Sequence, residues 1–230
     1  MLEQLTEFTG KISGLLWGSP LTLLILLGTG IYLTIRLRLV QVTGFKHSLQ
    51  LISGKYDRRD DSGEVSHFQA LSTALSATIG TGNIAGVATA ISLGGPGALF
   101  WMWVTAFIGM ATKFTECTLS LKFREVDADG RTAGGPMYTL LNGLKLKKTA
   151  MAFAVFALIA SFGIGNMVQA NSVVDGLAYL HPEAKNYAWV IGLVLAILVG
   201  LVIIGGVRRI ARVASTIVPF MAVIYVTAGL

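Results

Sequence analysis

The chain has 230 residues, of which 53% are hydrophobic and 13% are charged, and its formal net charge is +6. Soluble domains carry about 25% charged residues, so this composition indicates an integral membrane protein. The positive charge then indicates lysine and arginine in cytoplasmic loops rather than nucleic-acid binding. The single cysteine, Cys117, excludes an intramolecular disulfide and a cysteine zinc site.

Six apolar stretches are long enough for membrane helices, which need about 20 residues each. They cover residues 15–35, 70–93, 97–121, 150–174, 187–207 and 213–230. Open strands cannot span lipid, and no alternating barrel pattern is present, so we expect an all-α polytopic protein. The leader carries Glu3 and Glu7 where a signal peptide is basic, so the first segment is predicted to be retained. The sixth is still apolar at Leu230, which predicts a truncated sequence.

The charges between these segments predict the orientation of the chain. Basic residues gather after the first, third and fifth segments: Arg36, Arg38, Lys46, Lys55, Arg58 and Arg59; Lys122, Arg124, Arg131, Lys145, Lys147 and Lys148; and Arg208, Arg209 and Arg212. The opposite side has only Lys11 and Lys185. Because cytoplasmic loops are enriched in lysine and arginine, we expect the N-terminus outside.

The second segment contains the unusual stretch "SATIGTGNIAGVATA", residues 76–90. Glycine costs about 1 kcal/mol relative to alanine inside a helix, so "GTGN" at residues 80–83 is a plausible place for the helix to unwind. Broken backbone at membrane depth is tolerated where it is buried in protein or lines a cavity, and transporters use such breaks to bind substrates and ions. Tight packing of small residues against neighbouring helices is the alternative interpretation.

The fourth segment carries a second polar patch. Phe162, Asn166 and Gln169 follow the spacing i, i+4 and i+7, which puts them on one face of an ideal helix. An amide in hydrocarbon needs a partner. The patch is equally compatible with hydrogen bonds between helices and with contact to a polar ligand beside the break.

The third segment contains two charges, Lys113 and Glu116, spaced i, i+3. Charges within a span usually pair. We expect these two to pair with each other near the cytoplasmic end, as a structural or gating ion pair rather than a direct substrate contact.

Several motifs together resemble the alanine or glycine:cation symporters, the sodium/alanine symporter family. They are "GGPGALFWMWVTAFIGMATKFTE" (94–116), "SHFQALSTALSATIGTGNIAGVATA" (66–90), "AGGPMY" (133–138) and "FGIGNMVQAN" (162–171). The resemblance runs through essentially the whole chain, although members of this family are roughly twice as long.

The resemblance implies a fold of the leucine-transporter type, built from inverted repeats. Residues 1–67 would form an extra N-terminal transmembrane helix and a basic cytoplasmic loop. Residues 68–230 would form the first repeat of the transporter core, with its first helix broken at Gly80–Asn83.

The resemblance also implies particular roles for residues at the break. The amides of Thr81 and Gly82 would hold an amino-acid carboxylate, and backbone carbonyls such as those of Thr78 or Ile79 would suit sodium. The Asn83 side chain would serve the ion or the substrate. The pocket would be lined by Phe162, Asn166 and Gln169.

The function that follows is symport of alanine or glycine with sodium across the cytoplasmic membrane, by alternating access around the break. The partners are the amino acid, sodium and the lipid bilayer, with no nucleic acid. The sequence has no catalytic triad, metal-ligand spacing or phosphate loop in the right context, so we expect no enzyme, no cofactor and no metal beyond sodium. A membrane channel or a non-transporting scaffold subunit is the alternative.

Overall fold

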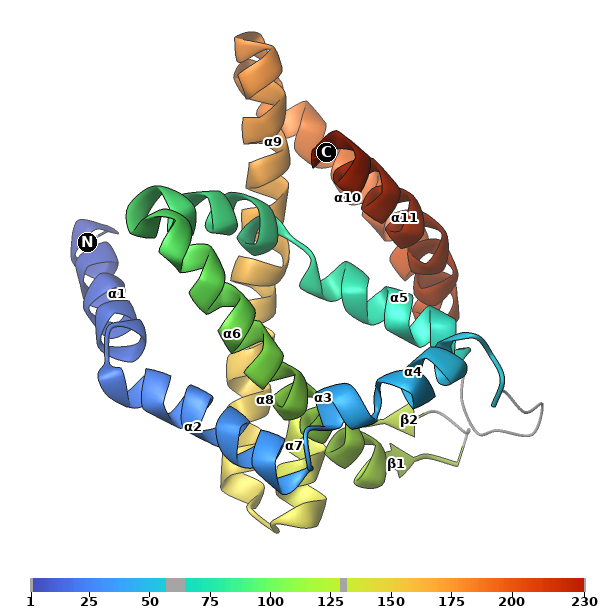
Figure 1. Cartoon of the computed structure of the whole chain (residues 1–230). Coiled ribbons are helices and arrows are strands. Elements are labelled where there is room, and N and C mark those ends of the chain that lie inside the picture. Colours follow the sequence, from blue (N-terminus) through green and yellow to red (C-terminus); the bar gives the residue numbers. More distant parts are fainter. Residues whose placement is uncertain (1, 57–64, 129–131, 230) are drawn as a thin grey trace. The chain divides into compact units, whose positions relative to one another are not determined.

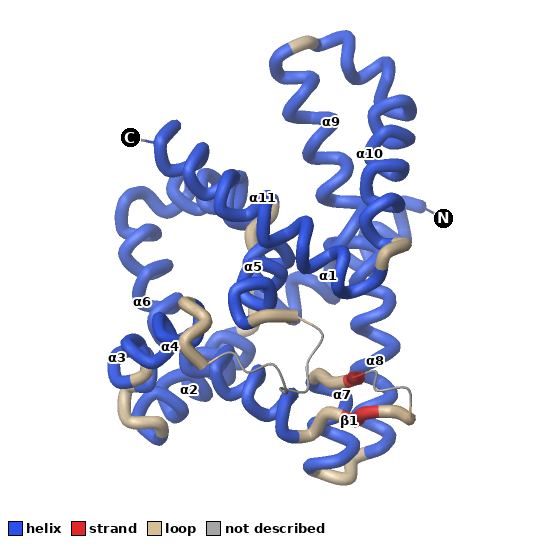
Figure 2. Tube along the Cα trace, turned by 90° about the vertical axis from the view of Figure 1, so that its right-hand side faces the viewer, coloured by secondary structure: helices blue, strands red, loops and turns tan. Residues whose placement is uncertain are grey.

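The computed structural model describes residues 2–56, 65–128 and 132–229. Arg58, Arg59 and Arg131 of the predicted basic loops lie outside these residues, as does Leu230. Nearly all of the described chain is helical, with one antiparallel pair of two-residue strands (Figures 1 and 2). The chain divides into two compact units, a first unit of Met1–Phe45 with Gly94–Leu146 and a second unit of Lys46–Leu93 with Lys147–Leu230.

The first unit combines the N-terminal helices with the later part of α6 and the elements that follow it. Its elements are α1 (Leu2–Trp17), α2 (Pro20–Arg36), α3 (Val40–Thr43), the later part of α6 (Val87–Lys122), β1 (Glu125–Val126), β2 (Thr132–Ala133), α7 (Pro136–Tyr138) and the π-helix η2 (Thr139–Gly143). The predicted first span began at residue 15, whereas the helix α1 already begins at Leu2. The axis bends by 42° between α1 and α2, where Ser19 caps α2 by accepting a hydrogen bond from the Leu21 amide and Pro20 occupies its first turn.

Small and polar residues allow α2 to pack closely on the later part of α6. A Cβ atom at Gly30 would collide with Ile108, so only glycine permits this approach. Gln41 Nε2 donates to Thr34 Oγ1 at 2.9 Å and to the Phe107 carbonyl at 3.1 Å. These contacts tie α2, α3 and α6 together within the first unit.

The long helix α6 is interrupted at Gly95. This residue has φ 63° and ψ −166°, a conformation that is essentially restricted to glycine, and Pro96 follows it. The segments before and after Gly95 are therefore two helices, and they belong to different units. This interruption lies between the predicted spans 70–93 and 97–121.

The second unit is built mainly from helices around α5 and α11. Its elements are α4 (Phe45–Ile52), α5 (His67–Thr78), the π-helix η1 (Gly82–Gly86), the start of α6, α8 (Lys147–Phe162), the π-helix η3 (Gly163–Met167), α9 (Val168–Leu180), the 3₁₀-helix η4 (Pro182–Tyr187), α10 (Ala188–Ile203) and α11 (Gly206–Gly229). A capping box between Ser66 and Gln69 starts α5. Helix α5 lies along α11 (Figure 1), and α9 lies beside α10 (Figure 2). The buried residues of α5 and α11 are small, with Ser72 on α5 and Ala211 and Ala214 on α11.

Four helical stretches of the described chain are long and apolar enough to cross a membrane, or up to five if α1 and α2 form one bent span. The four are Gly82–Lys122, Lys147–Leu180, Pro182–Ile203 and Gly206–Gly229. The predicted number was six. The difference arises because the stretch Gly82–Lys122 combines the two predicted spans on either side of Gly95, and because the bend between α1 and α2 divides the predicted first span. The arrangement fits an all-helical, multi-pass membrane protein.

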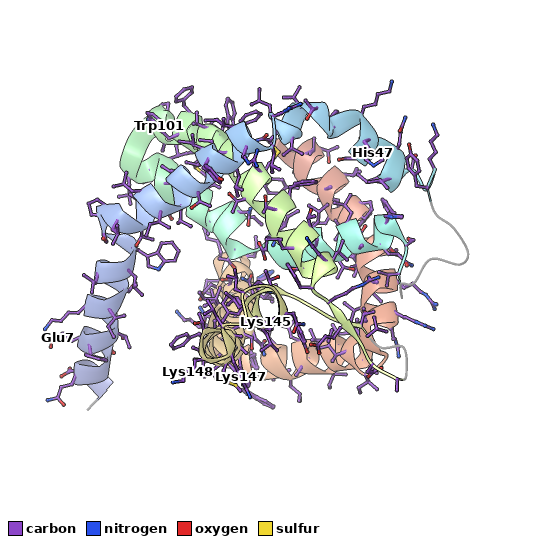
Figure 3. All side chains as sticks on the ribbon, turned by 90° about the horizontal axis from the view of Figure 1, so that it is seen from below. Glu7, His47, Trp101, Lys145, Lys147 and Lys148 are labelled. Atoms are coloured by element: carbon purple, nitrogen blue, oxygen red, sulfur yellow. The ribbon has the colours of Figure 1, made fainter. Side chains whose placement is uncertain are left out.

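Two predicted loops are shorter than expected. Arg208, Arg209 and Arg212 were predicted to lie in a loop, but they lie inside α11, since the positive φ of Gly206 (69°) turns the chain within one residue and the helix starts at once. Likewise, Lys147 and Lys148 begin α8 (Figure 3).

Candidate functional site

The helix that begins at His67 is broken where the composition predicts unwinding. Helix α5 ends at Thr78, and Ile79 has an extended backbone with φ −80° and ψ 108°. Helical geometry returns at Thr81 and continues as η1 from Gly82. A break is therefore present, but it lies at Ile79 and Gly80, and of the predicted residues 80–83 only Gly80 is outside helical structure.

The break leaves backbone groups without helical partners. The carbonyl oxygens of Thr78 and Ile79 accept no hydrogen bond from any residue that the structure describes. Asn83 closes the turn with two hydrogen bonds. Its backbone N–H donates to the Gly80 carbonyl at 3.0 Å, and its side-chain Oδ1 accepts from the Gly80 backbone N–H at 3.4 Å. The break thus presents two acceptor oxygens and is stabilised by the asparagine side chain.

Gln169 of α9 reaches the other side of the same break. Its Oε1 accepts from the Thr81 amide at 3.2 Å and from the Thr81 hydroxyl at 2.8 Å. The Thr81 hydroxyl also lies 3.2 Å from Ser172 Oγ. Gly80 permits this contact, since a Cβ atom there would lie 3.1 Å from both polar atoms of the Gln169 side chain. The structure therefore brings together Thr81 and Gln169, which are 88 positions apart in the sequence.

Ser172 belongs to this cluster, although our sequence analysis did not single it out. It lies three residues after Gln169, on the same side of a helix, so an i, i+3 extension of the polar patch would have found it. Its hydroxyl donates to the Val168 carbonyl at 2.9 Å and can accept from Thr81.

The π-helix η3 changes the face on which the fourth-segment residues lie. A π-helix places an extra residue in the turn, so residues before and after it do not keep the spacing of an ideal α-helix. Asn166 and Gln169 line one groove of about 640 Å³ against α10, where Gly192, Ala196 and Gly200 leave space. Phe162 does not line this groove, and its side chain is 65% exposed. The groove therefore contains the two amides of the predicted face, and Phe162 is not among the residues that line it.

A second pocket lies on another side of the break. Ile79, Asn83 and Ile84 line an almost wholly apolar pocket of about 180 Å³, together with residues of α11 that include Met221 and Tyr225. Of the predicted ion-binding residues, Ile79 and Asn83 border this pocket, and Thr78 ends the helix beside it.

The predicted ion pair forms in the first unit. Lys113 Nζ lies 3.1 Å from Glu116 Oε2, which confirms the expected pairing. The pair borders a groove of about 370 Å³ between α2 and α6, lined by Leu23, Leu27 and Ile108 among others. The helix break and Gln169 belong to the second unit, whereas the Lys113–Glu116 pair belongs to the first unit and is described as a separate site.

The described part of the chain contains no cluster of three or more His, Cys, Asp or Glu side chains that could hold a metal ion. Sodium requires no such cluster, because unwound backbone carbonyls can coordinate it in transporters. The acceptor oxygens at the break therefore fit sodium better than a transition metal, which prefers nitrogen or sulfur ligands.

Comparison with known proteins gives consistent matches along the chain. The family model for the sodium:alanine symporter family matches residues 2–230. The sodium/alanine symporter AgcS of Methanococcus maripaludis is 52% identical over 231 residues, covering 97% of this chain and 49% of the relative. The probable sodium/glutamine symporter GlnT of Bacillus subtilis is 41% identical, covering 98% of this chain and 46% of the relative.

A third relative, the amino-acid carrier protein AlsT of Bacillus subtilis, is 37% identical, covering 90% of this chain and 43% of the relative. The chain thus spans about half the length of the curated relatives it matches. No solved structure matches it. With a broken helix, apolar spans and a family match from Leu2 onward, this chain belongs to the sodium:alanine symporter family.

Proposed function

We propose that this protein takes part in symport of a small neutral amino acid, alanine or glycine, with sodium across the cytoplasmic membrane. The observation that carries the proposal is the helix break between Thr78 and Gly82, in a chain whose family is named for sodium and alanine. Secondary transport makes and breaks no covalent bond. It needs a site that binds both solutes and opens to alternate sides of the lipid bilayer.

The amino acid would bind at the start of η1. The Thr81 and Gly82 amides point from the beginning of a helix, where N–H groups and the helix dipole favour an anionic carboxylate. A Cβ atom at Gly82 would meet no protein atom within 4 Å, so this residue leaves room for a ligand. Asn166 and Gln169 would provide polar contacts to the rest of the amino acid, and Phe162 would join them only if its side chain turned toward the groove.

Sodium would bind beside the carboxylate. The Thr78 and Ile79 carbonyl oxygens accept no hydrogen bond from the described chain, and oxygen is the ligand that a small hard cation prefers. The Asn83 Oδ1 atom lies at the same turn and can exchange its 3.4 Å contact with Gly80 for a cation. Binding of both solutes at one break would couple their movement.

The moving parts would follow the inverted-repeat plan of the leucine-transporter type. Residues 1–67 would be the extra N-terminal helix with its basic loop, and residues 68–230 the first repeat. The broken helix and the match to about half of each relative support this plan. The Lys113–Glu116 pair would act as a structural or gating contact near the cytoplasmic end of its helix.

The test is uptake of radiolabelled alanine by liposomes that contain the full-length protein as its gene encodes it. A symporter accumulates alanine above the outside concentration only when sodium runs inward, since each charge moving down 100 mV releases about 2.3 kcal/mol. Equal concentrations on both sides, whatever the sodium gradient, would indicate a channel. The absence of any protein-dependent uptake would favour the scaffold alternative.

A further inference from the structure

The two donors of Thr81 are already engaged by one oxygen atom. Gln169 Oε1 accepts from the Thr81 amide at 3.2 Å and from its hydroxyl at 2.8 Å. A threonine residue has one amide proton and one hydroxyl proton. The arrangement around Gln169 therefore uses both donors of Thr81, including the amide that the proposed substrate carboxylate would need.

The Gln169 carboxamide is held in this position from several sides. Its Nε2 donates to the Ile164 carbonyl of η3 at 3.4 Å. Ser172 lies within 3.2 Å of the same Thr81 hydroxyl. Gly80 has no side chain to obstruct the carboxamide, which a Cβ atom would meet at 3.1 Å. The contact therefore joins the break, through Gly80 and Thr81, to Ile164 of η3 and to Gln169 and Ser172 of α9.

A carboxamide oxygen and a carboxylate oxygen accept hydrogen bonds with similar geometry but unequal strength. Bonds to an ionised acceptor are roughly twice as strong as neutral ones. A carboxylate can therefore displace the Gln169 oxygen from Thr81, whereas a neutral group has little advantage over it. The two occupants exclude each other, because they need the same protons.

We propose that Gln169 regulates the substrate site by competing, through Oε1, with the substrate carboxylate for the amide and hydroxyl of Thr81. This inference rests on the proposed function, because it takes the substrate to be an amino acid bound at the break. Displacement of the carboxamide also draws Nε2 away from Ile164, so occupation of the break is transmitted to the π-helix between α8 and α9. Gln169 then selects for solutes with a carboxylate and leaves the site closed to solutes that lack one.

The first experiment replaces the neutral competitor with a charged one. In Gln169→Glu a tethered carboxylate takes the Thr81 donors, and we expect the affinity for labelled alanine, measured by equilibrium binding to the full-length protein in nanodiscs, to fall by about tenfold or more. The matched control is Asn186→Asp, which adds the same charge to an exposed residue of η4 in the same unit. A thermal unfolding midpoint like that of the wild type ensures that both variants are folded.

The outcomes separate this inference from the proposed function. If the wild-type protein binds no alanine, the proposed function itself fails. If it binds alanine and the two charged variants weaken binding equally, the effect is general repulsion and the competition is disproved. A much larger loss in Gln169→Glu supports it.

A second measurement follows the contact directly in the wild-type protein, and the Gln169→Glu variant serves only to assign the signal. The side-chain amide of Gln169 is observed by NMR in protein labelled with ¹⁵N-glutamine, and its signal is assigned by its disappearance in Gln169→Glu. We expect this signal to move when alanine and sodium saturate the protein and to stay in place with sodium and alaninamide, which lacks a carboxylate. An unchanged signal with saturating alanine would overturn the proposal.

Discussion

Gly82 leaves open space beside the backbone where helical structure resumes after the break. It lies in η1, and a Cβ atom built on it meets no protein atom within 4 Å. A side chain added there would therefore occupy space beside the backbone without disturbing a neighbouring side chain. Gly86, at the other end of the same π-helix, has equally open surroundings.

We expect Gly82→Val to reduce alanine uptake in proteoliposomes by at least about tenfold, because a lost hydrogen bond to a charged group costs about 1.5–3 kcal/mol. Gly86→Val is the matched control, since it introduces the same β-branched side chain into the same element. Similar uptake by both variants would show that the break serves packing alone. Thermal unfolding of each variant checks that the helix is intact.

At the scale of single elements, α6 depends on the conformation of one residue. Gly95 has φ 63° and ψ −166°, and a Cβ atom there would touch nothing within 4 Å. The cost of a side chain at this position therefore comes from the backbone conformation and not from a collision. Gly97, two residues later, has open space as well but no positive φ.

We expect Gly95→Ala to lower the free energy of unfolding by about 1–3 kcal/mol, the cost of placing a residue with a Cβ atom in this region of φ and ψ. Gly97→Ala should be neutral or slightly stabilising, because alanine favours helix more than glycine does. The comparison is made by thermal unfolding of the purified proteins in one detergent. Equal midpoints for the two variants would mean that the interruption at Gly95 is not required.

The whole molecule has an orientation that its charges predict. The lysine and arginine residues gather after the first, third and fifth apolar segments, and this asymmetry predicts that the N-terminus lies outside. Lys11 and Lys147 lie on opposite sides in this arrangement. Both side chains are exposed in the structure, so they can be labelled without disrupting packing.

In a Cys117→Ser background, Lys11→Cys should react with a membrane-impermeant maleimide in intact cells, and Lys147→Cys should react only after the cells are permeabilised. The physical reason is that positively charged loops are retained in the cytoplasm during insertion. The reverse labelling pattern would contradict the orientation. Labelling of both residues in permeabilised cells serves as the positive control.

The sequence by itself determined the features that depend on neighbouring residues. Apolar length predicts a multi-pass helical protein, although not the number of its spans. The glycines and β-branched residues around Gly80 predict the break, and the i, i+3 spacing predicts the Lys113–Glu116 pair. Each of these follows from local backbone preference or from hydropathy over one helix. The start of α1 at Leu2 was missed because its first residues are not continuously apolar, and a search for apolar length does not detect a helix of mixed polarity.

Only the tertiary structure decided which residues meet. The contact of Gln169 with Thr81 joins positions 88 apart, and it depends on how α9 packs beside the break. The π-helix η3 adds a residue to one turn between Phe162 and Gln169, which the period of an ideal helix does not anticipate. The close approach of α2 to α6 at Gly30 is likewise a property of two helices together. Such contacts depend on distance in space, and a local pattern contains no information about that distance.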